Sequence, residues 1–220
     1  MLNYKLVGKV AVLGLDDGKA NAVGHTFINS VNEGLDRAEA EATCVLLTGR
    51  PGVFSAGFDL KEFDKGPEAT NALVNQGANM LLRLFQHPQP VVVACAGHAV
   101  AAGAFTLLAS DVRLGVQGDF KIGLNETAIG MTLPIFGIQL AQARLSKRWQ
   151  TRCAVQGELL NPDEAMAAGF LDELVDTDSL FDTALTRASA LAELPTGAYA
   201  GNKQLMREPF IQAIKASLPI

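Results

Sequence analysis

Residues 91–110 read VVVACAGHAVAAGAFTLLAS, and this run joins three local patterns. Val91–Ala96 is a short apolar run, which predicts a strand buried on both faces. Gly97 follows, and the small residues of Ala99–Leu108 then predict a helix. The order strand, loop, helix is typical of α/β proteins, in which ligands gather at the carboxyl ends of the strands.

The same order occurs twice before this run, at residues 10–41 and 43–86. In each case an apolar strand precedes a stretch with apolar side chains at helical spacing. The repetition predicts an α/β fold, and the mostly helical last third predicts further helices beside it. We expect a core domain over residues 1–175 and a C-terminal helical region over residues 176–220.

The composition argues against several classes of function. The chain has 220 residues, 49% of them hydrophobic and 19% charged, which suits one domain with a sizeable core. The net charge is −5 and the basic residues are scattered, so no nucleic-acid-binding surface is indicated. No apolar run reaches the roughly 18 residues of a membrane helix. Three widely spaced cysteines argue against a disulfide framework or a zinc site and favour a cytoplasmic protein: Cys44, Cys95 and Cys153.

Two loops rich in small residues are candidates for a ligand site. They are Phe54–Leu60, after a predicted strand at Cys44–Leu47, and Gly97–Gly103, after the strand at Val91–Ala96. Small residues let a ligand approach the backbone, and the second loop leads into a helix whose free N–H groups carry the positive end of the helix dipole. Two converging N–H groups form an oxyanion hole. Taken alone, each loop is also explained by tight packing before a helix.

A third segment, Ile122–Pro134, contains a carboxylate in apolar surroundings. Burial of Glu126 would raise its pKa and its basicity, which suits the removal of a proton from carbon. The other interpretation is that Asn125 and Glu126 cap a helical turn. The spacing of the residues favours neither interpretation.

Together these segments resemble the crotonase, or enoyl-CoA hydratase/isomerase, superfamily. The resemblance implies a spiral of repeated ββα units with a helical C-terminal region, and an acyl-coenzyme A thioester as substrate. It covers most of the chain and rests on six segments: Lys19–Ala22, Phe54–Leu60, Gly97–Asp111, Gly123–Pro134, Leu159–Ala165 and Ala168–Val175.

The resemblance also implies roles for particular residues. The N–H groups of Ala56 and Ala102 are expected to hold the thioester oxygen, and Glu126 is expected to act as the base. Asp59 is expected to fasten its loop rather than to perform chemistry. The substrate-binding residues implied by the resemblance are Ala20, Phe58, Asp59, Leu60, Phe105, Leu133 and Phe136.

The family's hydratases use a pair of glutamates, and this chain matches one of them. Phe105 occupies the position of the other, so the resemblance is greatest to the monofunctional Δ3,Δ2-enoyl-CoA isomerases, which need one carboxylate. The expected function is the shift of a double bond in a 3-enoyl-CoA to the 2-position through a dienolate. The alternatives are an enoyl-CoA hydratase or acyl-CoA hydrolase of the same family, or a non-catalytic protein that binds coenzyme A thioesters.

No metal is expected, and no cofactor beyond the coenzyme A carried by the substrate. Neither a Gly-x-Gly-x-x-Gly fingerprint nor a P-loop is present, which argues against a nucleotide cofactor. The resemblance implies a homotrimer or hexamer. Members of the family usually continue beyond the position of Ile220, so the C-terminal helical region is expected to be shorter than theirs.

Overall fold

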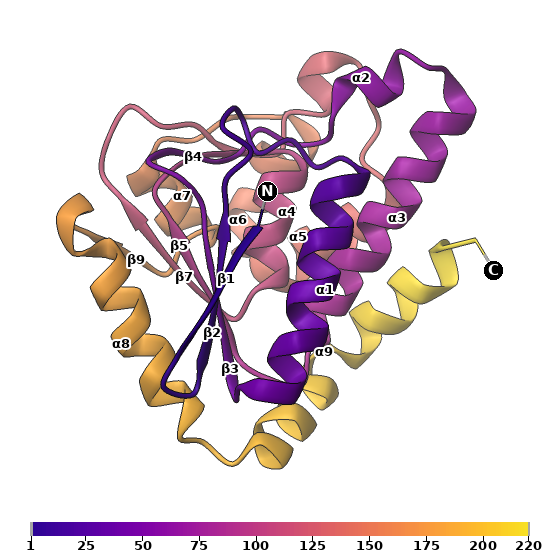
Figure 1. The fold of residues 1–220 in the computed structure, drawn as a ribbon. Coiled ribbons are helices and arrows are strands. Elements are labelled where there is room, and N and C mark those ends of the chain that lie inside the picture. Colours follow the sequence, from indigo (N-terminus) through magenta and orange to yellow (C-terminus); the bar gives the residue numbers. More distant parts are fainter. Residues whose placement is uncertain (1, 220) are drawn as a thin grey trace.

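The structure is a computed structural model, and it describes residues 2–219 of the chain. Most of it is built from units in which two strands are followed by a helix (Figure 1). These units confirm the predicted α/β spiral. The first two contain β1 (Leu2–Val7), β2 (Val10–Leu15), α1 (His25–Glu41), β3 (Cys44–Thr48), β4 (Gly52–Ser55), α2 (Leu60–Phe63) and α3 (Pro67–Phe85). The next two contain β5 (Val91–Cys95), β6 (Gly97–Val100), α4 (Ala102–Ala109), β7 (Val112–Val116), β8 (Ile122–Gly123) and α5 (Ile135–Arg144).

The remaining elements are mainly helices, as the sequence predicts. They are α6 (Lys147–Gln150), α7 (Pro162–Ala168), β9 (Glu173–Val175), α8 (Leu180–Ala192) and α9 (Thr196–Ser217), with short 3₁₀ or π turns at residues 127–129, 151–155 and 177–179. None of the helices within residues 2–219 is long and apolar enough to cross a membrane. The predicted domain boundary falls at the end of β9, and the division into two domains stays a prediction.

Both strands of the first unit lie in the larger of two sheets, and the strands of each later unit are divided between the two sheets. The larger sheet has the order β1-β2-β3-β5-β7-β9, in which β1 pairs antiparallel with β2 and all other pairs are parallel. The smaller sheet has the order β4-β6-β8 and is parallel throughout. The second strands of three successive units therefore lie side by side, and their carboxyl ends meet at one edge.

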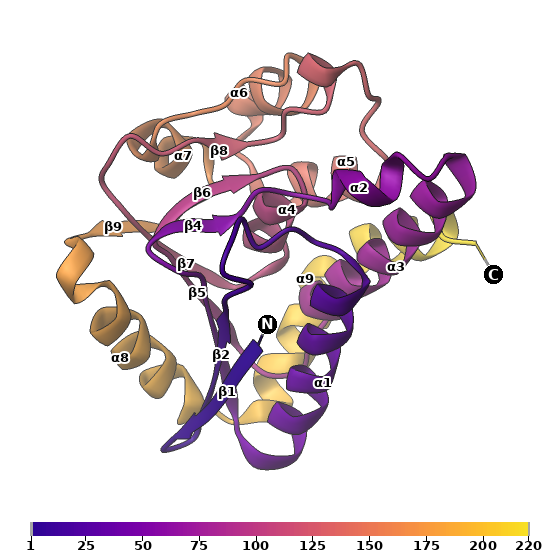
Figure 2. The ribbon, with the colours of Figure 1, turned by 45° about the horizontal axis from the view of Figure 1, so that its top comes forward.

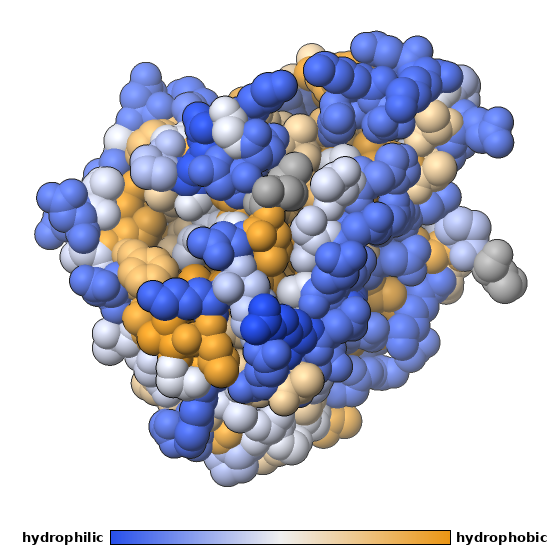
Figure 3. All heavy atoms as spheres, viewed as in Figure 1, coloured by the Kyte–Doolittle hydropathy of each residue, from blue (hydrophilic) through white to orange (hydrophobic). Residues whose placement is uncertain are grey.

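The larger sheet is covered on both faces, which explains its continuous apolar strands. On β2, for example, Ala11 and Leu13 face the main core with α1, α3, α4 and α5, whereas Val10 and Val12 face α8. Figure 1 shows α8 on one side of the sheet and α1, α3 and α9 on the other. The apolar side chains between the larger sheet and α8 form a second, smaller core. In Figure 3 apolar residues gather on the surface between α8 and the β1–β2 hairpin, at the margin of this second core.

Two of the expected element assignments are wrong. The first ligand loop was expected to begin at Phe54, but β4 extends to Ser55, and the helix expected from Ala99 begins at Ala102 because β6 occupies Gly97–Val100. Each of these strands has four residues and begins with a glycine. They are defined by pairing with strands distant in sequence, which a local pattern does not contain.

Gly97 lets β4 and β6 pack with their backbones in contact. A Cβ atom at this position would overlap the carbonyl group of Gly52 at the start of β4. Backbone atoms cannot move aside as a flexible side chain can, so any side chain at Gly97 would push the two strands apart.

We expect Gly97→Ala to lower the free energy of unfolding by about 3 kcal/mol, because the added methyl group overpacks the sheet. The matched control is Gly197→Ala, at an exposed position of α9 with no atom near the added Cβ. This control should gain up to about 1 kcal/mol from helix propensity. Urea denaturation followed by circular dichroism measures both values, and equal midpoints for the two variants would contradict the close packing of β4 on β6.

Candidate active site

Three loops meet at the carboxyl edge of the smaller sheet, which Figure 2 shows with the top of the molecule turned forward. They follow β4, β6 and β8, and their register places Ser55 beside Ala99 and Val100 beside Gly123. The loops therefore bring together segments that are about 70 residues apart in the chain, the two glycine-containing loops and the turn that carries Glu126. This arrangement is typical of ligand sites in α/β proteins.

Asn21 holds the first loop in place. It is fully buried with a positive φ of 50°, and its side-chain amide donates to the carbonyls of Leu15 and Phe54. Ser55 in turn donates its hydroxyl to the carbonyl of Asn21. The turn at Lys19–Ala22 is therefore a scaffold that fixes where the backbone after β4 runs.

The expected role of Ala56 does not agree with its hydrogen bonding. Its N–H donates to the carbonyl of Ala20 at 3.0 Å. A donor already bonded to a backbone carbonyl is not free to hold a thioester oxygen, so the expectation for the Ala56 N–H is wrong in this structure. Ala20 binds this loop and does not line the cavity described below.

The N–H of Phe58 is free where that of Ala56 is not. Phe58 forms a parallel bridge with Val23, in which Val23 donates to the carbonyl of Gly57 and accepts from the N–H of Asp59. The N–H of Phe58 itself points away from this bridge and has no partner among residues 2–219. The Asp59 carboxylate accepts from the N–H of Lys61 and so caps α2, which agrees with a role in fastening the loop.

The second loop places free N–H groups at the start of α4. Ala101 has φ 51° and ψ −117°, a conformation that L-residues rarely adopt, and its N–H donates to the carbonyl of Gly123. Ala102 is the first residue of α4, and within the described chain its N–H has no partner. A Cβ atom at Gly57 would contact Ala101, so the two loops lie against each other. The Phe58 and Ala102 donors therefore belong to adjoining loops.

Glu126 is a buried carboxylate without a hydrogen bond to one of its oxygens. Only 6% of the surface of Glu126 is exposed, and its Oε2 has no hydrogen-bond partner among residues 2–219. Burial raises the pKa of Glu126 above its ordinary value of 4.5. The turn is closed by the Glu126 carbonyl, which accepts from the N–H groups of Ile129 and Met131. Glu126 thus combines a fixed backbone with a reactive, poorly solvated side chain.

A cavity of about 490 Å³ opens where the three loops meet. Among the residues that the structure describes, Glu126 is the one ionisable side chain in its wall. The remaining wall is mostly apolar, which suits an acyl chain. The lining residues are Ala22, Ala56, Phe58, Leu60, Phe63, Thr70, Asn71, Val74, Ala101, Phe105, Asn125, Glu126, Ile129, Met131, Thr132 and Pro134.

Phe105 forms the inner wall, and two of the expected substrate contacts lie behind it. The rings of Phe105 and Phe136 meet edge to face with centroids 5.5 Å apart. Leu133 and Phe136 are buried and are absent from the cavity wall, so they hold Phe105 in position instead of lining the cavity. Gly137 leaves room for the Phe105 ring, because a Cβ there would approach the ring to 2.6 Å.

Comparison with known proteins agrees with this geometry. Residues 6–218 match the family described as Enoyl-CoA hydratase/isomerase. The chain belongs to this family. It is therefore an enzyme of the enoyl-CoA hydratase/isomerase type, with the crotonase fold that the sequence predicts.

Individual relatives of this hydratase/isomerase carry both activities in their names. A solved enoyl-CoA hydratase/isomerase family protein from Pseudomonas syringae is 42% identical, with a TM-score of 0.96 over 99% of this chain and 94% of that one. The human mitochondrial enoyl-CoA delta isomerase 1 is 28% identical over 90% of this chain and 68% of its own length. A putative enoyl-CoA hydratase of Thermus thermophilus is 31% identical over 84% of this chain and 74% of its own length.

Several residues that line the cavity of this hydratase/isomerase were not predicted from the sequence. The wall contributed by α3, namely Thr70, Asn71 and Val74, comes from a helix whose amphipathic pattern gives no sign of a ligand. Ile129 and Met131 are exposed apolar residues on the turn after Glu126, at 54% and 37%. Large apolar side chains that are exposed beside a buried carboxylate indicate a site for an apolar ligand. This exposure becomes known only when the structure shows where the turn lies.

The three cysteines of the enzyme are poor nucleophiles. All are buried, and burial raises the pKa of Cys44 and of Cys95 to about 12. Within residues 2–219 no group of three or more histidine, cysteine or acidic side chains is placed to hold a metal ion. Glu126 is therefore the group in the cavity wall that is suited to proton transfer.

The raised pKa of Glu126 predicts a pH-dependent stability difference. Burial favours its protonated form, so the folded enzyme loses stability as the pH rises from the ordinary pKa of 4.5 through the raised value. Glu126→Gln lacks this titration. Its free energy of unfolding, relative to the wild type, should increase between about pH 4 and pH 8 in urea denaturation. A difference that is constant over this range would contradict the burial of an ionising Glu126.

Proposed function

We propose that this enzyme converts a 3-enoyl-CoA into the conjugated 2-enoyl-CoA, with Glu126 as its single base. One observation carries the proposal: Glu126 is the one ionisable side chain in the described cavity wall, and Phe105, in the first turn of α4, fills the position at which a second acid would stand. One carboxylate is sufficient to move a proton, whereas adding water across a double bond is helped by two groups that position and activate the water.

The oxyanion hole is formed by the N–H groups of Phe58 and Ala102. Both are free in the structure, and their loops touch through Gly57 and Ala101. The helix dipole of α4 adds positive potential at Ala102. These donors hold the thioester oxygen, and they matter most when that oxygen becomes negatively charged.

The reaction needs one proton and no redox step. Glu126 removes a proton from C2, and the electron pair of that C–H bond forms the dienolate, with its charge on the thioester oxygen. The neutral Glu126 then returns the proton to C4, while the double bond moves from C3–C4 to C2–C3. The apolar wall around Phe105 excludes water from the dienolate.

A hydratase is the second candidate, because relatives such as the Thermus thermophilus protein carry that name. No separate cofactor enters the proposed reaction, since coenzyme A arrives with the substrate. A homotrimer or hexamer and a cytoplasmic location also remain proposals.

The direct test is to mix the purified protein with trans-3-hexenoyl-CoA and record the ultraviolet absorbance of the conjugated thioester. We expect the absorbance to rise at a rate proportional to enzyme concentration. A protein that binds the thioester in calorimetry but leaves its absorbance unchanged would overturn the proposed isomerisation.

A further inference from the structure

A second cavity, of about 440 Å³, lies at the far ends of α4 and α5 beside α9. Asp111, two residues after the end of α4, and Arg144, the last residue of α5, both line it, as do Lys203 and Arg207 of α9. The active-site cavity touches the other ends of the same helices, at Ala101 and Pro134. The two cavities are thus separated by the length of a short helix, about 12–15 Å.

The wall of this second cavity carries three cations and one carboxylate. Asp111 is shared, since its Oδ2 accepts from Lys203 at 2.6 Å and its Oδ1 from Arg207 at 2.8 Å. Lys203 uses its remaining donors on the carbonyls of His87 and Gln89. The one carboxylate in the wall is therefore already occupied by two cations.

Among the residues the structure describes, Arg144 is the cation of this wall that forms no ion pair with a carboxylate. Its neighbour Arg113 pairs with Asp172, but the one protein acceptor recorded for Arg144 is the backbone carbonyl of Asp111 at 3.1 Å. Its Nε is buried without a partner. Burial, followed by the nearby charges of Arg113 and Arg207, lowers the pKa of Arg144 to about 10. A guanidinium with unused donors in a cavity is suited to bind an oxyanion through two parallel hydrogen bonds.

The rest of the wall is largely apolar. Phe85, Ala143, Met206 and Phe210 line it, and Met206 is 81% exposed at its rim. A bare inorganic anion would leave these side chains in contact with water. An anion with a short hydrocarbon tail would satisfy Arg144 and cover the apolar wall together.

We propose that this cavity is a second binding site, for a small organic carboxylate with a short apolar tail, anchored by the guanidinium of Arg144. The site is separate from the cavity that contains Glu126 and does not depend on the reaction assigned to it. Asn202 and Tyr199 complete the wall and offer further polar contacts.

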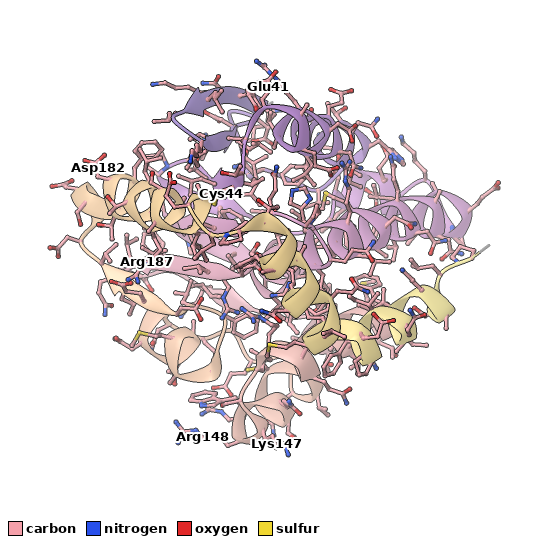
Figure 4. The ribbon with its side chains drawn as sticks, turned by 90° about the horizontal axis from the view of Figure 1, so that it is seen from below. Glu41, Cys44, Lys147, Arg148, Asp182 and Arg187 are labelled. Atoms are coloured by element: carbon pink, nitrogen blue, oxygen red, sulfur yellow. The ribbon has the colours of Figure 1, made fainter. Side chains whose placement is uncertain are left out.

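The test is titration calorimetry of the full chain with sodium hexanoate, with hexanol and inorganic phosphate as comparison ligands. We expect hexanoate to bind, and hexanol and phosphate to bind at least about tenfold more weakly. Hexanol lacks the negative charge that Arg144 would bind, and phosphate lacks the tail that would cover the apolar wall. Arg144→Gln should weaken hexanoate binding at least about tenfold. The matched control Arg148→Gln removes the same charge from an exposed residue of α6, at the outer edge of the molecule in Figure 4, and should bind as the wild type does.

A second pair of variants keeps the test decisive if Arg144→Gln does not fold. Asn202 is exposed on α9 at the cavity rim. Asn202→Asp adds a competing carboxylate and should weaken hexanoate binding several-fold relative to Asn202→Ala. Absence of hexanoate binding would overturn the proposal. So would binding that is unchanged in both Arg144→Gln and Asn202→Asp, because the hexanoate would then occupy another site.

Discussion

Glu126→Gln is expected to lower kcat for isomerisation by about 10⁴-fold, at the upper end of what a general base contributes. Glutamine has nearly the same shape but cannot accept a proton at the working pH. No other ionisable side chain lines the cavity within the described residues, so no neighbour can take over the transfer. The measurement is the initial rate of conjugation of trans-3-hexenoyl-CoA at saturating substrate.

The same variant should bind the substrate and fold normally. Glu126 has an oxygen without a hydrogen-bond partner, so a neutral amide costs the folded state little. Glu33→Gln is the matched control, since Glu33 is exposed on α1 and makes no ion pair among residues 2–219. Its rate should equal that of the wild type. A Glu126→Gln enzyme that retains more than about a tenth of the wild-type rate would show that Glu126 is not the base.

Ala102→Pro is expected to lower kcat by about 10²–10³-fold, the effect of losing one oxyanion-hole donor. Proline has no N–H, and position 102 is the first residue of α4, where proline fits a helix well. The substitution therefore removes the proposed donor and keeps the helix. The rate loss should appear in kcat more than in KM, because the hydrogen bond strengthens as the oxygen becomes negative.

Ala102→Val is the control for the added bulk, since valine keeps the N–H. Thermal unfolding of both variants establishes whether α4 is retained. If the proline and valine variants lose activity equally while both remain folded, the rate loss comes from crowding, and the N–H of Ala102 is not a donor to the thioester oxygen.

The sequence allowed the strands of the larger sheet and the longer helices to be predicted. The apolar run Val91–Ala96 and the helical spacing within residues 43–86 are long enough to identify an element, and the structure places β5 and α3 there. The smaller sheet was missed. Its strands span two to four residues, and they exist because close backbone contacts, such as that of Gly97 with Gly52, bring distant loops together.

The candidate site also has one part that local sequence patterns predict and another part that they do not. Glu126 was found because a carboxylate in an apolar run is an unusual local pattern, and the structure buries it in the cavity wall. The free N–H of the first loop was expected at Ala56, two residues before Phe58, where the structure has it. Whether Ala56 or Phe58 has a free N–H depends on the hydrogen bond to Ala20 and the bridge to Val23, and neither contact can be derived from local sequence. The same holds for the wall supplied by α3.

The most direct test of a single-base isomerase compares two rates on one preparation of the wild-type enzyme. The first is the formation of conjugated thioester from trans-3-hexenoyl-CoA, and the second is the loss of that chromophore when trans-2-hexenoyl-CoA is offered in water. With Glu126 as the one ionisable side chain of the described cavity wall and Phe105 in the place of a second acid, isomerisation should exceed hydration by at least about 100-fold. Hydration as fast as isomerisation, or faster, would contradict the assignment of one base and one transferred proton.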